Sequence, residues 1–289
     1  MKDYILRAGA ADDSVRIFIA TTQNLVQRAQ ELHKTTPVAT AALGRLLTAA
    51  CMMGQTLNND TDITTITIKG DGEIGGVVAV TNNKSEVKGY VHNPQVKHMT
   101  KAPGKLDVGR AVGNGYLYVA RDLGLKDPVT GQVELVSGEI AEDITSYFAV
   151  SEQTPSSVSL GVLVDTDFSV KCAGGYIIQL LPFAPDNIVK YLEEKLPHFP
   201  SMTTLLDAGK TPEDILQMLF GEYNTVIYDR VEPEYKCNCS REKTQKALAG
   251  VGADELRLIL EEDSGANIHC HFCGTDYWFN EEDIQGLIE

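Results

Sequence analysis

Four cysteines near the end of the chain place the strongest constraint on how it can fold. Cys237 and Cys239 are separated by one residue in EYKCNCSREK, and Cys270 and Cys273 are separated by two residues in CHFC. Two close pairs of thiols match the ligand set of a tetrahedral, all-sulfur zinc site. C-x-x-C is a common half-site and C-x-C is a rarer one, so the combination is distinctive. We predict that these four cysteines bind one Zn²⁺ ion.

The small number of cysteines in the chain indicates the redox state of the cellular compartment in which the protein works. The 289 residues include 6 cysteines, far fewer than the disulfide frameworks of small secreted domains contain. The first residues show no apolar core of a secretory signal, so we expect a reducing cytosol. Cys51 and Cys172 stand alone among apolar residues, and free cysteine is one of the most frequently buried residue types. We therefore predict that both pack in the core.

The charge of the chain is acidic and unevenly distributed. The formal net charge is −15, and residues 231–289 contain 13 acidic and 5 basic side chains. Nucleic-acid binding depends on basic groups that displace counterions from phosphates, so this balance argues against it. A zinc-ribbon factor that binds nucleic acid or acts in translation remains the alternative for the four-cysteine tail. Salt-sensitive RNA binding would favour that alternative.

Residues 1–182 carry the signals of an α+β core domain. Two helices are predicted early, at about 22–33 and 37–56, and the second is apolar nearly all round. A helix without a polar face is usually fully buried. Short apolar runs bounded by Gly, Asp or Pro predict strands that follow one another without regular helical connections, which favours antiparallel sheets that enclose the buried helix. These runs are 63–70, 115–122, 131–139, 157–165 and 168–181.

Motifs of other functional classes are absent from the sequence or stand in the wrong context. G-x-G-x-x-G occurs at Gly70, Gly72 and Gly75, but a strand-like run follows it, whereas a dinucleotide site needs a helix there. We predict a turn between strands. The apolar stretch 37–54 is rich in Ala and Thr and carries Arg45, which disfavours a membrane span. No catalytic motif is visible, so we expect that the protein is not an enzyme. An enzyme that contains a structural zinc is kept as a further alternative to the zinc-ribbon factor.

Residues 183–230 are predicted to form a helical linker. In TPEDILQMLFG, Thr211 is a good N-cap, Pro212 occupies the first helical position, and acidic residues follow in the first turn. One face of this helix is apolar, and we call it the linker stripe: Ile215, Leu216, Leu219 and Phe220. The segment has no core of its own, so the linker stripe must pack on another part of the protein.

Residues 231–289 are predicted to form a small C-terminal zinc domain. A segment of this size is near the limit at which an apolar core alone is stable, and structural zinc contributes on the order of 10 kcal/mol to folding. Thiolates are also the form that oxidants attack. The spacing permits a disulfide within C-x-x-C and a more strained one within C-x-C, and either bond would remove two ligands. We predict a domain that is folded with zinc and unfolded without it.

Long stretches of the chain resemble one known family. GKLDVGRAVG, ARDLGLKDPVTGQVELVSGEIAEDITSYFAVSEQTPSSVSLGVLV, AGGYIIQLLP and the terminal C-x-C and C-x-x-C are similar to those of the 33-kilodalton heat shock chaperonins, the redox-regulated bacterial holdases. The resemblance spans essentially the whole sequence and shows no departure at the cysteines. The core of that family, two sheets that enclose a helix, agrees with the burial expected for 37–56.

The resemblance also implies a function and partners. The four cysteines would bind zinc when reduced, and oxidation would form the disulfides Cys237–Cys239 and Cys270–Cys273. Loss of zinc would unfold the tail and the linker, and the exposed apolar surface would hold unfolding client proteins without ATP under stress. The linker stripe is our candidate for part of that surface. The resemblance further implies an oxidised homodimer, transfer of clients to ATP-dependent foldases, and a location in the bacterial cytoplasm.

Overall fold

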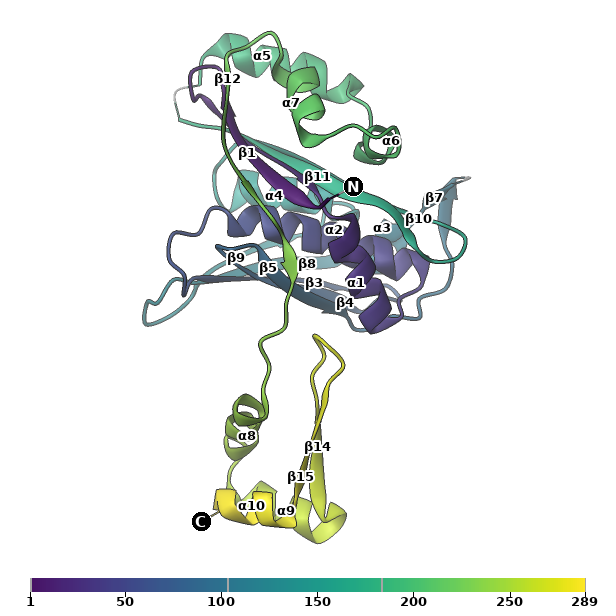
Figure 1. The fold of residues 1–289 in the computed structure, drawn as a ribbon, viewed down its shortest axis with the longest axis vertical. Helices are drawn as coiled ribbons and strands as arrows, with labels where there is room; N and C mark the ends of the chain where they lie inside the picture. Colours follow the sequence, from purple (N-terminus) through teal and green to yellow (C-terminus); the bar gives the residue numbers. More distant parts are fainter. Residues whose placement is uncertain (1, 103, 183, 289) are drawn as a thin grey trace. The chain divides into compact units, whose positions relative to one another are not determined.

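The computed structural model describes residues 2–102, 104–182 and 184–288, and the chain divides into two compact units, Met1–Tyr235 and Lys236–Glu289 (Figure 1). The segment 183–230, which the sequence suggests as a separate linker, lies within the first unit. The second unit begins at Lys236, whereas the sequence suggests residue 231 as the start of the C-terminal domain.

A buried helix organises the first unit. In α2 (Pro37–Gly54), every residue from Val38 to Gly54 except Arg45 is buried. By length and composition alone this helix could cross a membrane, but 89% of it is buried inside the structure. Burial in the core, rather than the content of Ala and Thr, is therefore what argues against a membrane span.

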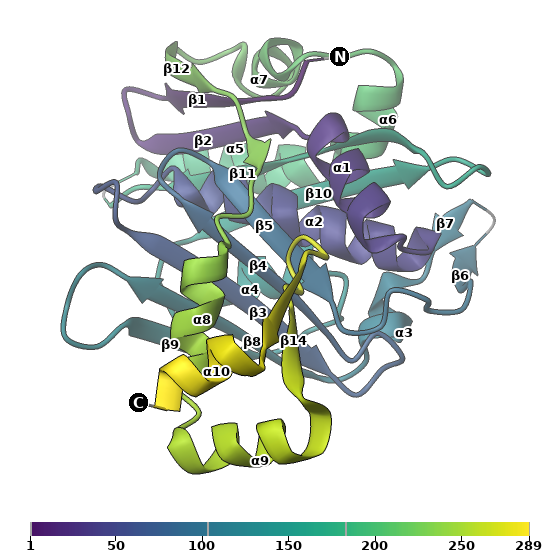
Figure 2. The ribbon, with the colours of Figure 1, turned by 60° about the horizontal axis from the view of Figure 1, so that its bottom comes forward.

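Two sheets lie on either side of α2 (Figures 1 and 2). Sheet A is antiparallel and has the order β10 (Ser156–Val164), β11 (Val170–Leu180), β2 (Val15–Thr21), β1 (Tyr4–Ala10) and β12 (Thr225–Val231). Sheet B has the order β13 (Glu234–Tyr235), β5 (Glu86–Val91), β4 (Gly76–Asn82), β3 (Ile63–Gly70), β8 (Gly115–Asp122) and β9 (Val129–Glu134). Because α2 contacts strands of both sheets, the predicted α+β core with an enclosed helix is confirmed.

The remaining elements of the core domain are short. They are α1 (Gln23–His33), the hairpin β6 (Thr100–Ala102) and β7 (Lys105–Leu106), α3 (Val108–Val112) and α4 (Ala141–Val150). The glycines of G-x-G-x-x-G lie at the turn between β3 and β4, as predicted. A Cβ atom on Gly70 would lie 1.9 Å from the Val112 carbonyl oxygen, so glycine is needed there for close approach to α3.

The run 131–139 is a strand only as far as Glu134. The following loop instead surrounds Asp143, which is fully buried near the start of α4. Its carboxylate accepts hydrogen bonds of 2.8 to 3.2 Å from four backbone N–H groups, those of Val136, Ser137, Gly138 and Ile140. The backbone N–H groups that follow the strand therefore bond to one side chain instead of to a neighbouring strand.

Helices of the segment 183–230 cover the outer face of sheet A (Figure 1). They are α5 (Asp186–Lys195), a 3₁₀ turn (Leu196–His198), α6 (Met202–Asp207) and α7 (Pro212–Phe220). Thr211 caps α7 as predicted, because Asp214 N donates to Thr211 Oγ1 (3.1 Å) and Thr211 N donates to Asp214 Oδ2 (2.9 Å). The linker stripe is buried in one apolar cluster with Leu6, Ile17 and Ile19 of sheet A.

Two strands near the end of the first unit are absent from the sequence-based prediction. β12 pairs antiparallel with β1, and β13 pairs parallel with β5, so the chain passes from an edge of sheet A to an edge of sheet B. Tyr235 anchors β13: its hydroxyl donates to Gly89 O (2.7 Å) and lies 2.9 Å from His33 Nε2. The chain is thus fixed on sheet B two residues before Cys237.

The second unit is small. It contains α8 (Arg241–Ala249), α9 (Ala253–Asp263), the hairpin β14 (Gly265–His269) and β15 (Asp276–Asn280), and α10 (Glu281–Ile288). Among the described residues, its buried apolar side chains are Leu248, Leu256, Phe279 and Ile284. The guanidinium of Arg241 lies 4.4 Å above the Phe279 ring. So thin a core is marginal for a folded unit.

Candidate metal centre

Cys237 and Cys239 lie in the short segment that precedes α8. Ser240 caps this helix by accepting a hydrogen bond from Lys243 N (3.3 Å), so the helix begins directly after the C-x-C pair. The Lys243 ammonium donates to the Asn238 carbonyl oxygen (2.8 Å), which stands between the two cysteines. The first turn of α8 thereby holds the C-x-C loop in place.

Cys270 and Cys273 lie in the turn of the β14–β15 hairpin. Cys270 N donates to Thr275 O (2.9 Å), and Gly274 N donates to Cys270 O (2.8 Å). Gly274 has a φ of 71°, a left-handed conformation that glycine adopts without the strain that other residues experience. These bonds fold the C-x-x-C stretch into a compact turn.

The structure brings together all four cysteines that the sequence singled out. Their sulfur atoms all lie within 4.8 Å of one another. Cys237 Sγ is 3.7 Å from Cys270 Sγ, and Cys239 Sγ is 3.3 Å from Cys273 Sγ. With Zn–S bonds of about 2.3 Å, a tetrahedral site places its sulfurs about 3.8 Å apart. The four cysteines can therefore hold one metal ion that binds thiolates.

Burial and hydrogen bonding act differently on the four thiols. Burial raises the pKa of the Cys237 thiol to about 12 and also raises the pKa of Cys270. Burial acts in the same direction on Cys273, but hydrogen bonds with Thr275 lower the pKa of this thiol to about 7. A bound dication favours the thiolate form of every ligand, so coordination deprotonates even the buried thiols.

Two hydroxyl groups near the sulfurs are absent from the sequence-based prediction. Tyr277 OH lies 3.2 Å from Cys239 Sγ, and Thr275 Oγ1 lies 3.2 Å from Cys273 Sγ. Each hydroxyl can donate to a thiolate and orient it, as groups around metal ligands commonly do. Thr275 stands two residues after Cys273, whereas the hairpin brings Tyr277 to a cysteine 38 residues away. No local pattern therefore indicated Tyr277.

The histidines beside Cys270 take other partners. His269 Nδ1 lies 2.9 Å from Asp276 Oδ1, and its ring packs edge-on against that of His271. The group of candidate ligands found among the described residues consists of the four cysteines. The site is thus an all-sulfur one.

The linker stripe, the other predicted set of site residues, belongs to the first unit. Ile215, Leu219 and Phe220 are 0% exposed and Leu216 is 3% exposed. The stripe is therefore a covered apolar surface between α7 and sheet A, and another protein can reach it only if α7 moves away.

Comparison with known proteins finds one family that matches nearly the whole chain. A family model described as Hsp33 protein matches residues 3–280. The 33 kDa chaperonin of Acetivibrio thermocellus is 48% identical over 289 residues, and this match covers 100% of the present chain and 98% of the relative. The 33 kDa chaperonin of Lachnoclostridium phytofermentans is 45% identical over 288 residues, with coverage of 100% and 99%.

A solved structure gives the same result. The crystal structure of a 33 kDa chaperonin, a heat shock protein 33 homologue from Thermotoga maritima, superposes with a TM-score of 0.92 at 39% sequence identity and covers 100% of this chain and 98% of that one. The fold, the four-cysteine centre and the names of these relatives define the class of the protein as a chaperone. Within that class, the chain belongs to the Hsp33 protein family.

Proposed function

We propose that this chaperone is a holdase that works without ATP and is switched on by oxidation of its four-cysteine centre. The convergence of four thiols within 4.8 Å carries the proposal, because these thiols stand in a unit with a very small apolar core. The reduced, metal-bound protein would be the resting form. In this form the linker stripe is covered and cannot hold a client.

We propose Zn²⁺ as the ion of the centre, held by Cys237, Cys239, Cys270 and Cys273. When bound, zinc supplies the crosslink that the thin core lacks, on the order of 10 kcal/mol of folding free energy. The hydroxyls of Tyr277 and Thr275 would donate to two of the thiolates and keep them aimed at the ion.

Oxidation would convert the ligands into bridges. Two thiolates pass two electrons to one molecule of a peroxide such as H₂O₂, which leaves as two hydroxide ions, and one S–S bond forms. Pairing within each half would give Cys237–Cys239 and Cys270–Cys273, after which no thiolate remains to hold the ion. The C-x-C bridge is the more strained of the two, so it would be the easier to reduce again.

Loss of order in the switch domain (231–289) would then release the linker (183–230) from the core domain (1–182). Undocking of α7 would uncover the linker stripe and the apolar face formed by Leu6, Ile17 and Ile19, which lie beneath it. A contiguous apolar surface of this kind binds unfolded polypeptides. We further propose that the oxidised form is a homodimer in the cytoplasm and that reduction passes clients to ATP-dependent foldases.

The test compares the full-length protein in two states, reduced with zinc and oxidised with peroxide. A chemically unfolded enzyme is diluted into each, and its aggregation is followed by light scattering. A chromogenic chelator records zinc release, and mass spectrometry maps the disulfides. We expect suppression of aggregation in the oxidised state alone, in step with zinc release. Equal suppression in both states would refute the switch, and aggregation in both would refute the holdase.

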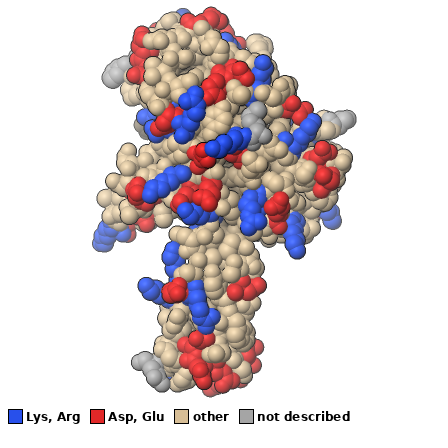
Figure 3. Space-filling view, viewed as in Figure 1, with Lys and Arg blue, Asp and Glu red and all other residues tan. Residues whose placement is uncertain are grey.

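The same samples test the alternative of a nucleic-acid factor. Binding of RNA by the reduced form, weakened by salt, would support it. Acidic side chains gather over the end of the second unit that α9 and α10 form (Figure 3), and the first turns of these helices carry Asp254, Glu255, Glu281, Glu282 and Asp283. This surface repels phosphates, so we expect no such binding.

A further inference from the structure

The strand β12 is held to sheet A mainly through its backbone. It pairs with β1 from Thr225 to Val231, yet none of its side chains is buried, and Val226 and Tyr228 are about half exposed at 46% and 52%. Its apolar contribution to stability is therefore small, and backbone hydrogen bonds contribute only about 0.5–1.5 kcal/mol each. β12 is thus a strand that can be displaced without opening the core.

The outer edge of β12 is poorly suited to pairing with another chain. The register with β1 shifts between Arg7 and Ala8, which leaves Tyr228 as a bulge. Asp229 and Arg230 follow it and form ion pairs with Arg7 (3.0 Å) and Glu213 (2.7 Å). Bulges and charges are the usual features that keep edge strands from pairing.

The strand beneath is mostly buried and apolar, and Arg7 is its one charged residue. In β1, Ile5, Leu6, Ala8 and Ala10 are 0–1% exposed. Ala11 N donates to Asn224 O (3.1 Å) on the side of β12. Because bonding direction alternates along a strand, the backbone groups of Ile5, Arg7 and Gly9 also face β12. Removal of β12 would turn these groups into a free edge.

This edge borders the apolar face that α7 covers. Leu6, Ala8 and Ala10 belong to the same buried cluster as the linker stripe. β12 and α7 are parts of one segment, joined by the Arg230–Glu213 ion pair, so a release of the linker would remove both together. The result would be an unpaired strand edge beside a bare apolar face.

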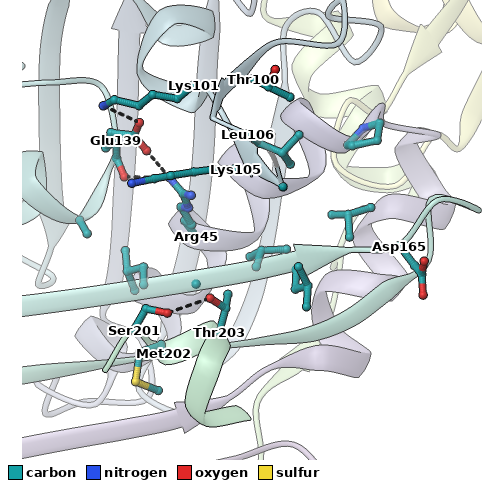
Figure 4. Close-up of a pocket in the computed structure, with 18 of the residues that line it drawn as sticks. Arg45, Thr100, Lys101, Lys105, Leu106, Glu139, Asp165, Ser201, Met202 and Thr203 are labelled. Atoms are coloured by element: carbon teal, nitrogen blue, oxygen red, sulfur yellow. Dashed lines mark hydrogen bonds and ion pairs between the residues drawn. The ribbon is translucent and has the colours of Figure 1, made fainter. Parts of the chain in front are cut away.

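The opposite edge of sheet A also contacts the linker, through α6 and β10, but charged side chains border it. β10 borders a cavity of about 850 Å³ whose wall carries Arg45, Lys101 and Glu139 (Figure 4). Arg45 Nη1 lies 2.7 Å from Glu139 Oε2, and Lys101 Nζ lies 3.7 Å from Glu139 Oε1. These charges disfavour an apolar segment, and no strand among the described linker residues pairs with β10.

We propose that displacement of β12 uncovers the edge of β1 and that an extended segment of an unfolded polypeptide pairs there with Ile5, Arg7 and Gly9. Alternate apolar side chains of the segment would lie on the face that α7 has left, as in other cases of strand addition to a sheet edge. The bound segment takes the place of β12. This inference rests on the proposed function and specifies how the client is held.

Three labelled peptides of equal sequence test the proposal on the full-length oxidised protein. The parent is seven residues long, uncharged, and alternates Val and Thr; the other two carry N-methyl groups on the odd or on the even residues. Only one set of amides can face β1, so we expect one methylated isomer to bind at least about tenfold more weakly and the other to bind like the parent. Equal binding of all three, or equal loss with both isomers, would overturn the proposal.

A photoreactive form of the parent peptide then locates the site by mass spectrometry. Crosslinks to residues 4–10 in the oxidised state, and none there in the reduced state, are the expected result. Crosslinks confined to residues 156–164 would place the segment at β10 and overturn the proposal. Zinc release and suppressed aggregation in the same sample show whether the redox switch itself works, so failure of the edge and failure of the switch are distinguishable.

Discussion

Replacement of Leu219 by alanine tests whether the linker stripe holds α7 in place. Leu219 is 0% exposed and packs in the cluster formed with β1 and β2. Truncation of a buried leucine to alanine costs about 2–5 kcal/mol. If most of this cost falls on the contact between α7 and sheet A, a loss of about 3 kcal/mol raises the undocked population of α7 roughly 100-fold. The reduced, zinc-loaded protein would then expose its linker without oxidation.

Hydrogen exchange measured by mass spectrometry reads this population directly. We expect the amides of α7 to exchange roughly 100-fold faster in Leu219→Ala, while those of α2 keep their rates, and the fluorescence of an added hydrophobic dye to rise. Met218→Ala is the matched control, because Met218 lies in the same helix and is 36% exposed. Its effect should stay within about 0.5 kcal/mol.

Two results would refute this reasoning. The first is equal exchange of α7 in the Leu219→Ala and Met218→Ala variants, because burial of the stripe would then have no part in docking. The second is faster exchange of α2 together with α7, because the variant would then loosen the whole unit rather than undock the linker.

Three further predictions concern the metal, pH and core packing. Cys270→Ser should lower the zinc content and abolish the thermal transition of the second unit, followed through Trp278, the single tryptophan, while Cys172→Ser should keep one zinc per chain. Burial raises the pKa of Asp3 to about 6, so the folded state binds a proton more tightly than the unfolded state does. The free energy of unfolding of the first unit should therefore fall by up to about 3 kcal/mol as pH rises from about 4 to 6. Urea unfolding of Asp3→Asn should show a flatter dependence on pH, and parallel pH profiles for the variant and the parent would contradict the assignment. A Cβ atom on Gly44 would lie 2.6 Å from Val26 Cγ1, so Gly44→Ala should destabilise the first unit by about 1–3 kcal/mol, whereas Gly286→Ala meets no atom within 4 Å and should stabilise α10 by up to about 1 kcal/mol.

Local features of the structure followed from the sequence. The cap at Thr211 and the proline after it set the start of α7, and the apolar circumference of 37–56 indicated a helix that is buried as α2 (Pro37–Gly54). In the same way, the spacing of the cysteines indicated four side chains that can hold a metal ion. Each of these signals depends on residues within one helix or one turn, where geometry fixes the neighbours.

Longer-range features needed the folded chain. Tyr277 meets Cys239 only because the β14–β15 hairpin carries it there. β12 is bound to β1 mainly through the backbone, and β13 is held on sheet B by its pairing with β5 and by the Tyr235 hydroxyl. The local sequence of neither strand indicates its partner.

The amino-acid sequence by itself thus determined the four candidate ligands, the buried helix and the apolar stripe that must find a partner. The tertiary structure decided which surface that stripe covers and which strand edge β12 occupies. The reason is physical: every residue except proline offers the same backbone donor and acceptor, so the partner and register of a strand depend on the path of the whole chain. The side chain at each position can thus be interpreted from the sequence, whereas the pairing of the backbone can be known only from the folded structure.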